Sequence, residues 1–539
     1  MKLEQVAQKL ELERILQRVM RYAASEPGKE VLKALPFLTE VDVIKTELSR
    51  VTELKRLLEQ EEGFPLEGIY QVIPSIQRAG VEGAVLLPRE LHQVSSTLRS
   101  ARVLRSFLDR RRETFPLLWQ VAEPLYADKV LEYNIDQAID DSASVRASAS
   151  KELLSIRRTI AEKYEQLRKR LESILKGVSE LGFSQEEIIT TREGRMVIPV
   201  KSEHKNRVPG FIHSASSSGA TVFIEPTETL ELNNEIRSLQ FQEQREIDRI
   251  LRALTDQVGQ SRKALLANSA TLAQLDALHA RARYSIEILG VQPEVVFQGA
   301  LKLVQARHPI LMMSHGHVGT VPLDFELGDR YHTVIISGPN AGGKSVAMKC
   351  VGVVILMVQH GLHIPASDQS VVRVFRKLFV DIGDEQSIEN DLSTFSSHLS
   401  NLKIIALGAD EDSLVLIDEI GTGTDPAEGG AIAAALLDSL TRRKAFTIAT
   451  THHSALKVFA SETEGVENGA MEFDQETLTP TYRYKSGVPG SSYALEMAAR
   501  LGFSEELLQK SRERLGFQHV KLDKLIAELE SSAQRYKRD

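Results

Sequence analysis

The sequence predicts a multidomain fold: an all-α core with lever helices and a small β clamp, followed by an α/β domain. Residues 1–140 place apolar side chains at three- and four-residue steps between proline breaks, which favours helices. Residues 187–226 contain short strand-like runs between two long helical stretches. From residue 291 onward, short apolar runs alternate with helical patterns. This alternation is typical of a parallel sheet covered by helices.

Length and composition exclude several classes of protein. The 539 residues correspond to about three to four domains of roughly 150 residues. A hydrophobic fraction of 42% excludes global disorder, and a formal net charge of -8 excludes a wholly basic nucleic-acid binder but allows a local basic patch. The single cysteine, Cys350, cannot form an internal disulfide. The longest apolar run, Val351 to Val358, is far shorter than the about 20 residues that cross a bilayer. We therefore expect a cytoplasmic protein with no membrane partner.

Two long helices are expected on either side of the β segment. The first runs from Ser142 to Lys176, where apolar residues from Leu153 to Ile174 alternate steps of three and four. The second runs from Thr227 to about Leu289. We therefore expect a stalk of two long helices that carries a small β domain at its end. The predicted domains are a helical core (1–140), a lever helix (141–186), a clamp (187–226), a returning lever helix (227–290), an α/β domain (291–486), and C-terminal helices (487–539).

The nucleotide site is predicted from GPNAGGKS, which fits the phosphate-loop pattern GxxxxGK[ST]. It follows the apolar strand Thr333–Ile336 and precedes a helical pattern; a chance match is the alternative. The glycines let backbone N–H groups turn toward phosphates, and the helix N-terminus adds partial positive charge. We expect Lys344 to reach the β- and γ-phosphates of ATP and Ser345 to bind Mg²⁺. The predicted nucleotide-binding residues are Gly338, Pro339, Asn340, Ala341, Gly342, Gly343, Lys344 and Ser345.

A phosphate loop needs an acidic side chain at the end of a neighbouring strand as a second ligand for Mg²⁺. The segment LVLIDE at residues 414–419 supplies it. Asp418 is expected to hold the metal, directly or through water. Glu419 is expected to polarise the attacking water as general base. The alternative is an acidic pair that only caps a helix.

Two further segments complete the predicted site. Ser393 and Thr394 stand at a helix start between the phosphate loop and the acidic strand, where they can donate to a phosphate or serve as a plain N-cap. His452 follows the next apolar strand, where it can sense the γ-phosphate or be a loop histidine without a role.

The order of these segments resembles the ABC-type ATPases, and specifically the MutS family. The family's phosphate loop is similar to GPNAGGKS here, and its signature segment is similar to LSTFSSHL. Its acidic strand with the following loop is similar to LVLIDEIGTGTDP, and its switch histidine is similar to the one in TTHH. Arg307-His308-Pro309 and the segment at 487–493 resemble the opening and closing of its ATPase domain. The resemblance covers about residues 300–520. It implies that residues 291–486 form a P-loop ABC-type ATPase domain, and that residues 487–539 form C-terminal dimerisation helices and the start of a linker coiled coil. It also implies a homodimer in which Ser393 faces the γ-phosphate held by the partner's Lys344.

The segment DIGDEQS at 381–387 and Thr422 resemble the second branch of the family, linked to recombination suppression and to rescue of collided ribosomes. The phosphate loop begins at Gly338, too early for the extra N-terminal domains of mismatch-repair members, so mismatch recognition is not expected. That branch usually continues into a coiled coil and a C-terminal Smr nuclease domain. This chain ends at Asp539, inside the helix that would lead there, so we expect either a shortened form of a longer protein or a naturally short member. Nuclease activity is not expected of this chain.

Substrate contact is assigned to the clamp. Between residues 192 and 207, five basic residues oppose two acidic ones, a local charge of +3, and no aromatic residue lies in the interval. This suits contact with backbone phosphates without base reading; a solvated hairpin is the alternative. The candidate contacts are Arg192, Arg195, Lys201, Lys205 and Arg207.

Three functions follow as hypotheses. The favoured one is an ATP-dependent clamp that senses and splits stalled or collided ribosomes, with rRNA as partner. The second is a clamp on branched DNA that suppresses homologous recombination, and the third is an SMC-like structural chromosome ATPase. The sequence does not separate the first two, since both substrates present dense phosphate.

Overall fold

The computed structural model combines helices with several sheets, in agreement with the mixed, multidomain fold predicted from the sequence. It describes residues 2–61, 63–184, 186–339, 342–383, 391–474, 477, 479–490, 495, 498–499 and 501–514. Two compact units are present. Unit 1 comprises residues 1–64, 110–121 and 273–539, and unit 2 comprises residues 65–109 and 122–272. Within the described residues, no helix is both long and apolar enough to cross a membrane.

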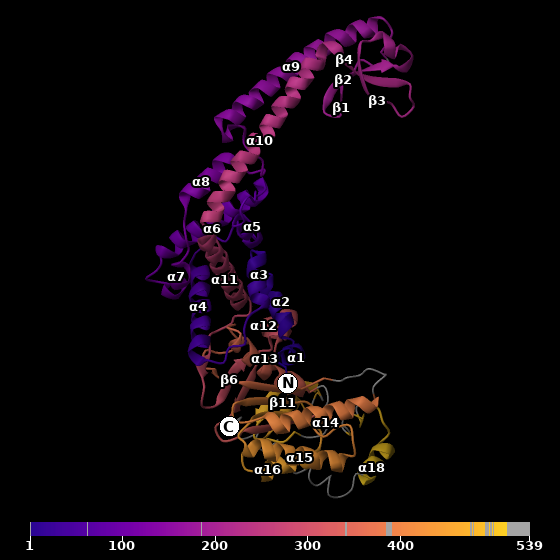
Figure 1. Ribbon diagram of the computed structural model, residues 1–539. Coiled ribbons are helices and arrows are strands. Elements are labelled where there is room, and N and C mark those ends of the chain that lie inside the picture. The colour runs from indigo at the N-terminus through magenta and orange to yellow at the C-terminus, as the bar shows by residue number, and fades with distance from the viewer. Residues whose placement is uncertain are drawn as a thin grey trace. The chain divides into compact units, whose positions relative to one another are not determined.

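Unit 1 is built on a six-stranded sheet of order β10-β11-β12-β8-β13-β14 (Figure 1). The strands are β8 (Thr333–Ser337), β10 (Lys377–Asp381), β11 (Ser413–Ile417), β12 (Phe446–Thr451), β13 (Val466–Asp474) and β14 (Thr479–Ser486). The first five strands of that order run parallel, and β14 is antiparallel to β13. The three strands expected around residues 333, 414 and 446 are therefore present as neighbours in one parallel sheet.

Both faces of this sheet are covered, which explains why its strands are almost continuously apolar. Val334 and Ile336 of β8 pack on the side of α13 (Lys344–Gln359), whereas Ile335 packs on the opposite side. The helices α14 (Asp391–Gly408), α15 (Pro426–Arg442) and α16 (Ser454–Glu462) contribute to that second core. The apolar run Val351–Val358 lies within α13 and is buried throughout. Figure 1 shows α14, α15 and α16 together on one side of the sheet.

A second, four-stranded sheet of order β5-β9-β6-β7 adjoins the same core. Its strands are β5 (Glu294–Val296), β6 (Leu301–Ala306), β7 (Leu323–Leu327) and β9 (Val371–Arg373). The helix α12 (Pro309–Gly319) connects β6 to β7 and starts with the proline of the RHP segment at its first position.

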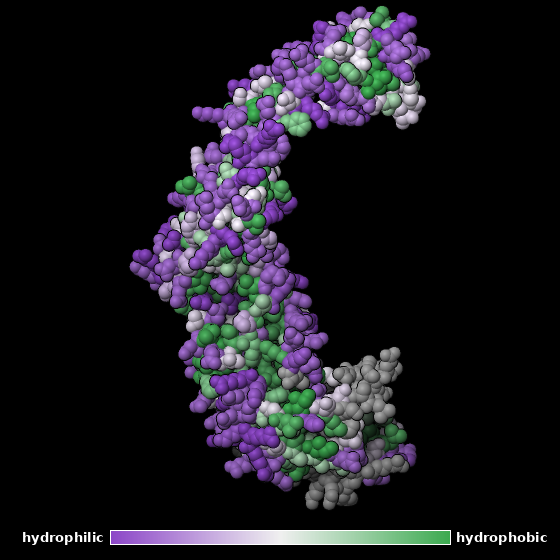
Figure 2. All heavy atoms as spheres, in the orientation of Figure 1, coloured by the Kyte–Doolittle hydropathy of each residue, from purple (hydrophilic) through white to green (hydrophobic). Residues whose placement is uncertain are grey.

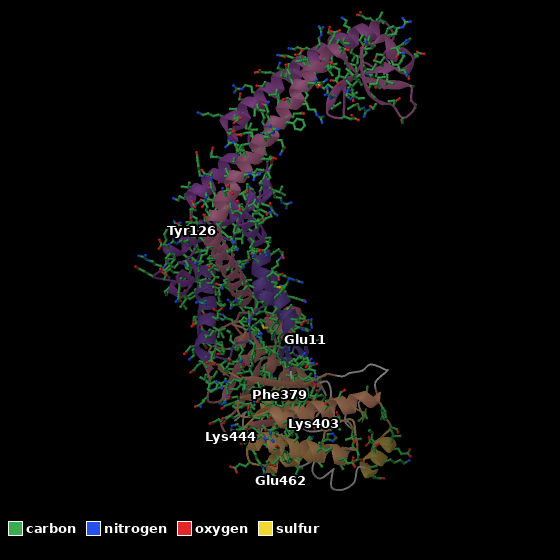
Figure 3. All side chains as sticks on the ribbon, viewed as in Figure 1. Glu11, Tyr126, Phe379, Lys403, Lys444 and Glu462 are labelled. Atoms are coloured by element: carbon green, nitrogen blue, oxygen red, sulfur yellow. The ribbon has the colours of Figure 1, made fainter. Side chains whose placement is uncertain are left out.

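The first 64 residues belong to unit 1, so the expected helical core of residues 1–140 is divided between the two units. Their helices are α1 (Leu3–Lys9), α2 (Leu12–Met20), α3 (Glu26–Lys33) and α4 (Val41–Gln60). Polar contacts between residues more than 250 positions apart in sequence attach these helices to the rest of unit 1. Arg18 Nε donates to Glu287 (2.8 Å), and buried Asp276 accepts from the backbone N–H groups of Ala24 and Ser25 (2.8 Å each). Glu11, labelled in Figure 3, lies 3.6 Å from Nζ of Lys349 on α13.

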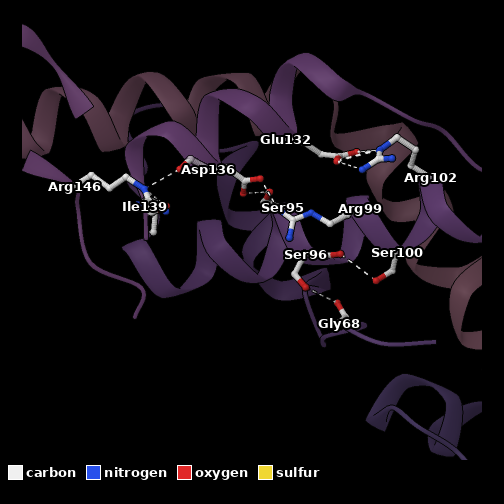
Figure 4. A network of polar contacts seen from close by, with 10 residues as sticks. All are labelled: Gly68, Ser95, Ser96, Arg99, Ser100, Arg102, Glu132, Asp136, Ile139 and Arg146. Carbon is white, nitrogen blue, oxygen red and sulfur yellow. Dashed lines mark hydrogen bonds and ion pairs between the residues drawn. The ribbon is translucent and has the colours of Figure 1, made fainter. Parts of the chain in front are cut away.

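Unit 2 contains a small helical body. Its helices are α5 (Ile73–Ala79), α6 (Pro88–Asp109) and α8 (Lys129–Ala138), and α7 (Pro116–Ala122) precedes α8 in the chain. Figure 4 shows the polar contacts between α6 and α8: Arg102 donates to Glu132 (3.0 Å), and Ser95 Oγ donates to Asp136 (2.8 Å). The apolar residues beneath them form one cluster with α9 (Lys151–Glu180) and α10 (Leu230–Gln260) of the same unit.

The two long helices differ from their predicted bounds. The first, α9 (Lys151–Glu180), begins later than expected because the Ser150 side chain caps it, accepting from Leu153 N at 3.0 Å. The returning helix is two helices, α10 (Leu230–Gln260) and α11 (Arg262–Glu287), separated at Ser261. Gly259 near this break is a weak helix former, and its missing side chain admits Ala79 O, which would lie 2.4 Å from a Cβ. α9 and α10 are joined by an ion pair between Arg157 and Glu243 (2.7 Å).

The predicted β segment forms an antiparallel sheet of order β1-β2-β4-β3, called the clamp sheet below. Its strands are β1 (Thr190–Arg192), β2 (Arg195–Lys201), β3 (Gly210–Ala215) and β4 (Thr221–Pro226), with a 3-10 helix η2 (Ser202–Arg207) between β2 and β3. Leu171 of α9 packs with Val200 and Ile224 in one apolar cluster. Hydrophilic residues cover most of the visible face of α9 and α10, and hydrophobic atoms surface on the clamp sheet (Figure 2).

Candidate nucleotide-binding site

The phosphate-loop segment leaves the carboxyl end of β8 and enters α13 in a conformation that requires glycine at two positions. Gly338 has φ 136° and Gly343 has φ 94°, both in the region that other L-residues rarely adopt. A Cβ on Gly343 would also lie 3.1 Å from the ring of Tyr482. Asn340 and Ala341, two of the predicted nucleotide-binding residues, lie outside the described residues.

The Lys344 side chain is folded over its own loop. Its Nζ donates to the carbonyl oxygens of Gly338 (2.9 Å) and Pro339 (3.0 Å), and it lies 3.4 Å from Nδ1 of His452. Burial lowers the pKa of Lys344 to about 8, although the carboxylates of Glu419 and Asp418 act in the opposite direction. The ammonium is thus held by neutral acceptors in a partly desolvated position.

Ser345 and Asp418 meet although 73 positions separate them. Ser345 Oγ donates to Asp418 Oδ1 at 2.9 Å, so the two predicted metal ligands present oxygens to one small space. Because β12 lies between β8 and β11 in the sheet, a side chain at the end of β12 also reaches this site. Thr450 Oγ1 donates to Asp418 Oδ1 at 2.5 Å. Thr450 is not among the residues predicted from the sequence, where its place in the TTHH segment is the signal that points to it.

Glu419 and His452 also meet at this edge. Glu419 has φ 51°, and its backbone N–H donates to Thr450 Oγ1 at 2.8 Å. Nε2 of His452 lies 3.2 Å from Glu419 Oε1, and both side chains are partly exposed. The structure therefore brings the predicted residues Lys344, Ser345, Asp418, Glu419 and His452 into one cluster.

A cavity of about 600 Å³ adjoins this cluster. One part of its wall is polar, from Lys344, Ser345 and Glu419, and the other part is mostly apolar. The apolar part includes Leu311, Val321, Pro322, Met471 and Tyr482. Its volume is in the range of about 300–1,000 Å³ that small-ligand sites commonly have.

The segment that closes the domain returns to the phosphate loop. The N–H of Gly490 donates to Ser337 Oγ at 2.8 Å, and Nζ of Lys457 on α16 donates to Gly490 O at 2.5 Å. A Cβ on Gly490 would lie 2.8 Å from Ser337 O, so only glycine permits this approach. The segment 487–490 thus packs against the end of β8.

The predicted signature residues stand at the start of α14. Ser393 and Thr394 lie in its first turn, and their side chains are outside what the structure describes. Further along the same helix, Nδ1 of His398 lies 2.5 Å from buried Asp381 Oδ2, and Asn401 donates to Asp381 Oδ1 at 2.9 Å. These contacts fix α14 to the end of β10.

The five basic residues predicted to contact nucleic acid differ in their surroundings. Arg195 forms an ion pair with Glu225 at 2.6 Å, and that carboxylate is only 1% exposed, so its charge is already paired. Arg192 lies over the ring of Phe223, 4.2 Å from the centroid, and Lys201 Nζ donates to Gly182 O at 2.9 Å. Lys205 and Arg207 are exposed. Although the interval 192–207 contains no aromatic residue, folding places aromatic rings beside its cations.

The comparisons with known proteins agree with this arrangement. The family model described as MutS domain V matches residues 334–517. A protein named Endonuclease MutS2 from Pelotomaculum thermopropionicum is 43% identical over 526 residues, covering 98% of this chain and 66% of that protein. A relative of the same name from Geobacillus sp. is 40% identical, and the match covers 67% of its length. A protein named Putative endonuclease MutS2 from Bacillus subtilis is 39% identical, and the match covers 68% of its length. The chain thus spans about two thirds of these relatives, and it belongs to the MutS2 family.

Proposed function

We propose that the chain is a homodimeric, ATP-hydrolysing clamp of MutS type that binds a phosphate-rich substrate and remodels it, with stalled or collided ribosomes as that substrate. The observation that carries the proposal is the convergence of Lys344, Ser345, Asp418, Glu419 and His452 at one edge of a parallel sheet. Ligands of open α/β sheets commonly bind at this edge.

ATP fits the cavity and the loop. The Lys344 ammonium would exchange its two carbonyl acceptors for the β- and γ-phosphates, and the start of α13 would face the same phosphates with its free N–H groups. The apolar part of the cavity wall offers a surface for the nucleobase.

The oxygens of Ser345 and Asp418 suit Mg²⁺, which prefers oxygen ligands and commonly binds through one or two carboxylates together with phosphates. When bound, the ion would neutralise charge on the phosphates. Thr450 holds the Asp418 carboxylate in place from β12.

Glu419 is the candidate general base. Its carboxylate is partly exposed at the mouth of the site, and Nε2 of His452 lies 3.2 Å from it. In this position it can accept a proton from a water molecule that attacks the γ-phosphate, while His452 orients the carboxylate.

The resemblance to ABC-type ATPases supports the dimer, in which Ser393 would complete the partner subunit's site. ATP would then hold the two ATPase domains together, and hydrolysis would release them, a two-state change biased by nucleotide contacts. The relatives' names describe endonucleases, which supports a nucleic-acid component in the substrate. A ribosomal substrate places the protein in the cytoplasm.

The test is a pull-down with the Glu419→Gln variant and ATP, which should trap the substrate-bound form. Enrichment of ribosomal RNA over DNA supports the ribosomal substrate. Enrichment of branched DNA over ribosomal RNA overturns it in favour of the recombination hypothesis. The matched control is the double variant Lys344→Ala, Glu419→Gln, which should not bind ATP and should enrich neither.

A further inference from the structure

A second cavity, of about 410 Å³, lies in unit 2 between the end of α9, the clamp sheet and η2. It is remote in sequence from the phosphate loop. Its volume again lies in the range of small-ligand sites. Its wall combines apolar residues with polar and charged ones: Ile174, Val178, Phe183 and Pro209 on one hand, and Arg170, Arg207, Thr227 and Glu228 on the other.

Gly177 keeps this cavity open. It lies in the last turn of α9, where glycine is the least favourable residue apart from proline. No atom lies within 4 Å of the position that a Cβ on Gly177 would occupy, so neither crowding nor a positive φ requires glycine here. Val178, beside it, is buried and contributes to the apolar wall.

Basic side chains face the aromatic ring at the cavity wall. The centroids of the Phe183 and His204 rings lie 4.4 Å apart, and the angle between the two ring planes is 34°. The Arg207 guanidinium lies 5.9 Å from the centroid of the Phe183 ring. Arg207 is exposed and forms no ion pair with any side chain that the structure describes. Two carboxylates are also near: Glu228 is paired with Arg170 at the rim, and Glu203 lies 3.4 Å from His204.

A cavity whose wall is partly apolar and partly polar, with an aromatic ring and an unpaired guanidinium in it, has the two parts that bind a nucleotide. Bases stack on aromatic and guanidinium planes, and the cation contacts the backbone phosphate. A base in a duplex is stacked between its neighbours and cannot enter such a cavity, whereas a base in a single-stranded segment can be turned outward.

We propose that this cavity holds one unstacked base of a single-stranded nucleic-acid segment, with the adjoining phosphate at Arg207. The inference rests on the proposed function of the clamp and adds a base contact to the phosphate contacts that the interval 192–207 indicates. The clamp sheet would thereby distinguish single-stranded segments from continuous duplex.

The probe is a fluorescein-labelled oligouridylate of about 12 nucleotides, within the site sizes of single-strand binders, compared with an abasic strand of equal length and charge. Binding of both strands to the full chain is measured by fluorescence anisotropy. The wild-type chain should bind the oligouridylate roughly tenfold more tightly than the abasic strand, because a stacked base adds about that factor.

Gly177→Leu should fill the cavity and reduce binding of the oligouridylate to that of the abasic strand, without changing binding of the abasic strand. Leucine is a better helix former than glycine, so α9 should persist, and far-ultraviolet circular dichroism verifies this. The matched control is Ser155→Leu, which adds a leucine at an exposed position of the same helix and should leave both affinities unchanged.

Arg207→Ala should weaken both strands by the same factor and lower the slope of log affinity against log salt by about one. Arg245→Ala, which removes an exposed charge from α10, should leave the preference and the slope unchanged.

If Gly177→Leu retains the wild-type preference for the oligouridylate, the base cavity is wrong. Equal wild-type binding of the two strands also overturns the base cavity and leaves the phosphate contact standing. If the wild-type chain binds neither strand, both the cavity and the proposed clamp contact are overturned.

Discussion

Nε2 of His452 lies 3.2 Å from Oε1 of Glu419, so the segment after β12 contacts the carboxylate that follows β11. The other ring nitrogen, Nδ1, lies 3.4 Å from Nζ of Lys344. One imidazole therefore touches both the cation of the phosphate loop and the candidate base. This contact is possible because β8, β12 and β11 are consecutive parallel strands whose carboxyl ends share one edge.

Glu419→Gln should bind ATP but hydrolyse it at least about 100-fold more slowly, because the amide cannot accept a proton from water. Steady-state phosphate release measures turnover, and a fluorescent ATP analogue measures affinity. With ATP the variant should also remain dimeric in analytical ultracentrifugation. Unchanged turnover would remove Glu419 from the role of base.

Lys344→Ala should abolish ATP binding, since it removes the cation that would meet the β- and γ-phosphates. Isothermal titration of ATP in the presence of magnesium gives the measurement. Lys349→Ala is the control on the same helix: this lysine lies 3.6 Å from Glu11 and does not contribute to the cavity wall. Retained ATP binding by Lys344→Ala contradicts the assignment of the loop.

Thr450→Val should lower turnover about tenfold while preserving the fold. Valine has nearly the shape of threonine but loses the hydroxyl that donates to Asp418 and accepts from the N–H of Glu419. The unpaired N–H should cost about 1–3 kcal/mol in the free energy of unfolding. Thr447→Val on the same strand is the control: within the described residues the Thr447 hydroxyl donates only to Ala445 O, so its loss should leave turnover unchanged. A Thr450→Val chain with wild-type turnover would show that its hydroxyl does not position Asp418 or Glu419.

His363 should make the stability of unit 1 depend on pH. Burial lowers the pKa of His363 to about 4, and its Nε2 lies 3.1 Å from Leu48 O, which can only accept a hydrogen bond. Between pH 6.5 and about pH 4 the unfolded chain binds a proton at this histidine and the folded chain does not. The contribution of the neutral histidine to the free energy of unfolding is therefore fully present above pH 6.5. The free energy of unfolding falls by about 1.4 kcal/mol per pH unit as the pH decreases from 6.5 to about 4.

The variant His363→Gln keeps a donor for Leu48 O and does not titrate. Urea unfolding at pH 7 and pH 5 should show a loss of stability about 2 kcal/mol smaller in the variant than in the wild-type chain. His317→Gln, an exposed position on α12, should behave like the wild-type chain. An equal loss in His363→Gln and the wild-type chain contradicts the neutral, buried imidazole.

Local patterns predicted much of the fold. The strands β8, β11 and β12 were predicted because a buried parallel strand is a short, continuous apolar run, and β1 to β4 because turn residues separate their runs. The bounds of the long helices were less accurate. The break at Ser261 follows Gly259, whose missing side chain admits Ala79 O, a contact between positions that lie 180 residues apart in sequence.

The sequence by itself determined the chemistry available to this protein: a glycine loop with Lys344, an acidic strand end, and cations in the β segment. Only the tertiary structure decided which of these groups act together. It brought the hydroxyls of Ser345 and Thr450 to the same oxygen of Asp418, paired Arg195 with Glu225, and left Arg207 beside Phe183. The physical reason is that residue type and spacing fix local conformation and charge, whereas strand order and helix packing fix the distances over which buried charges and hydrogen bonds act.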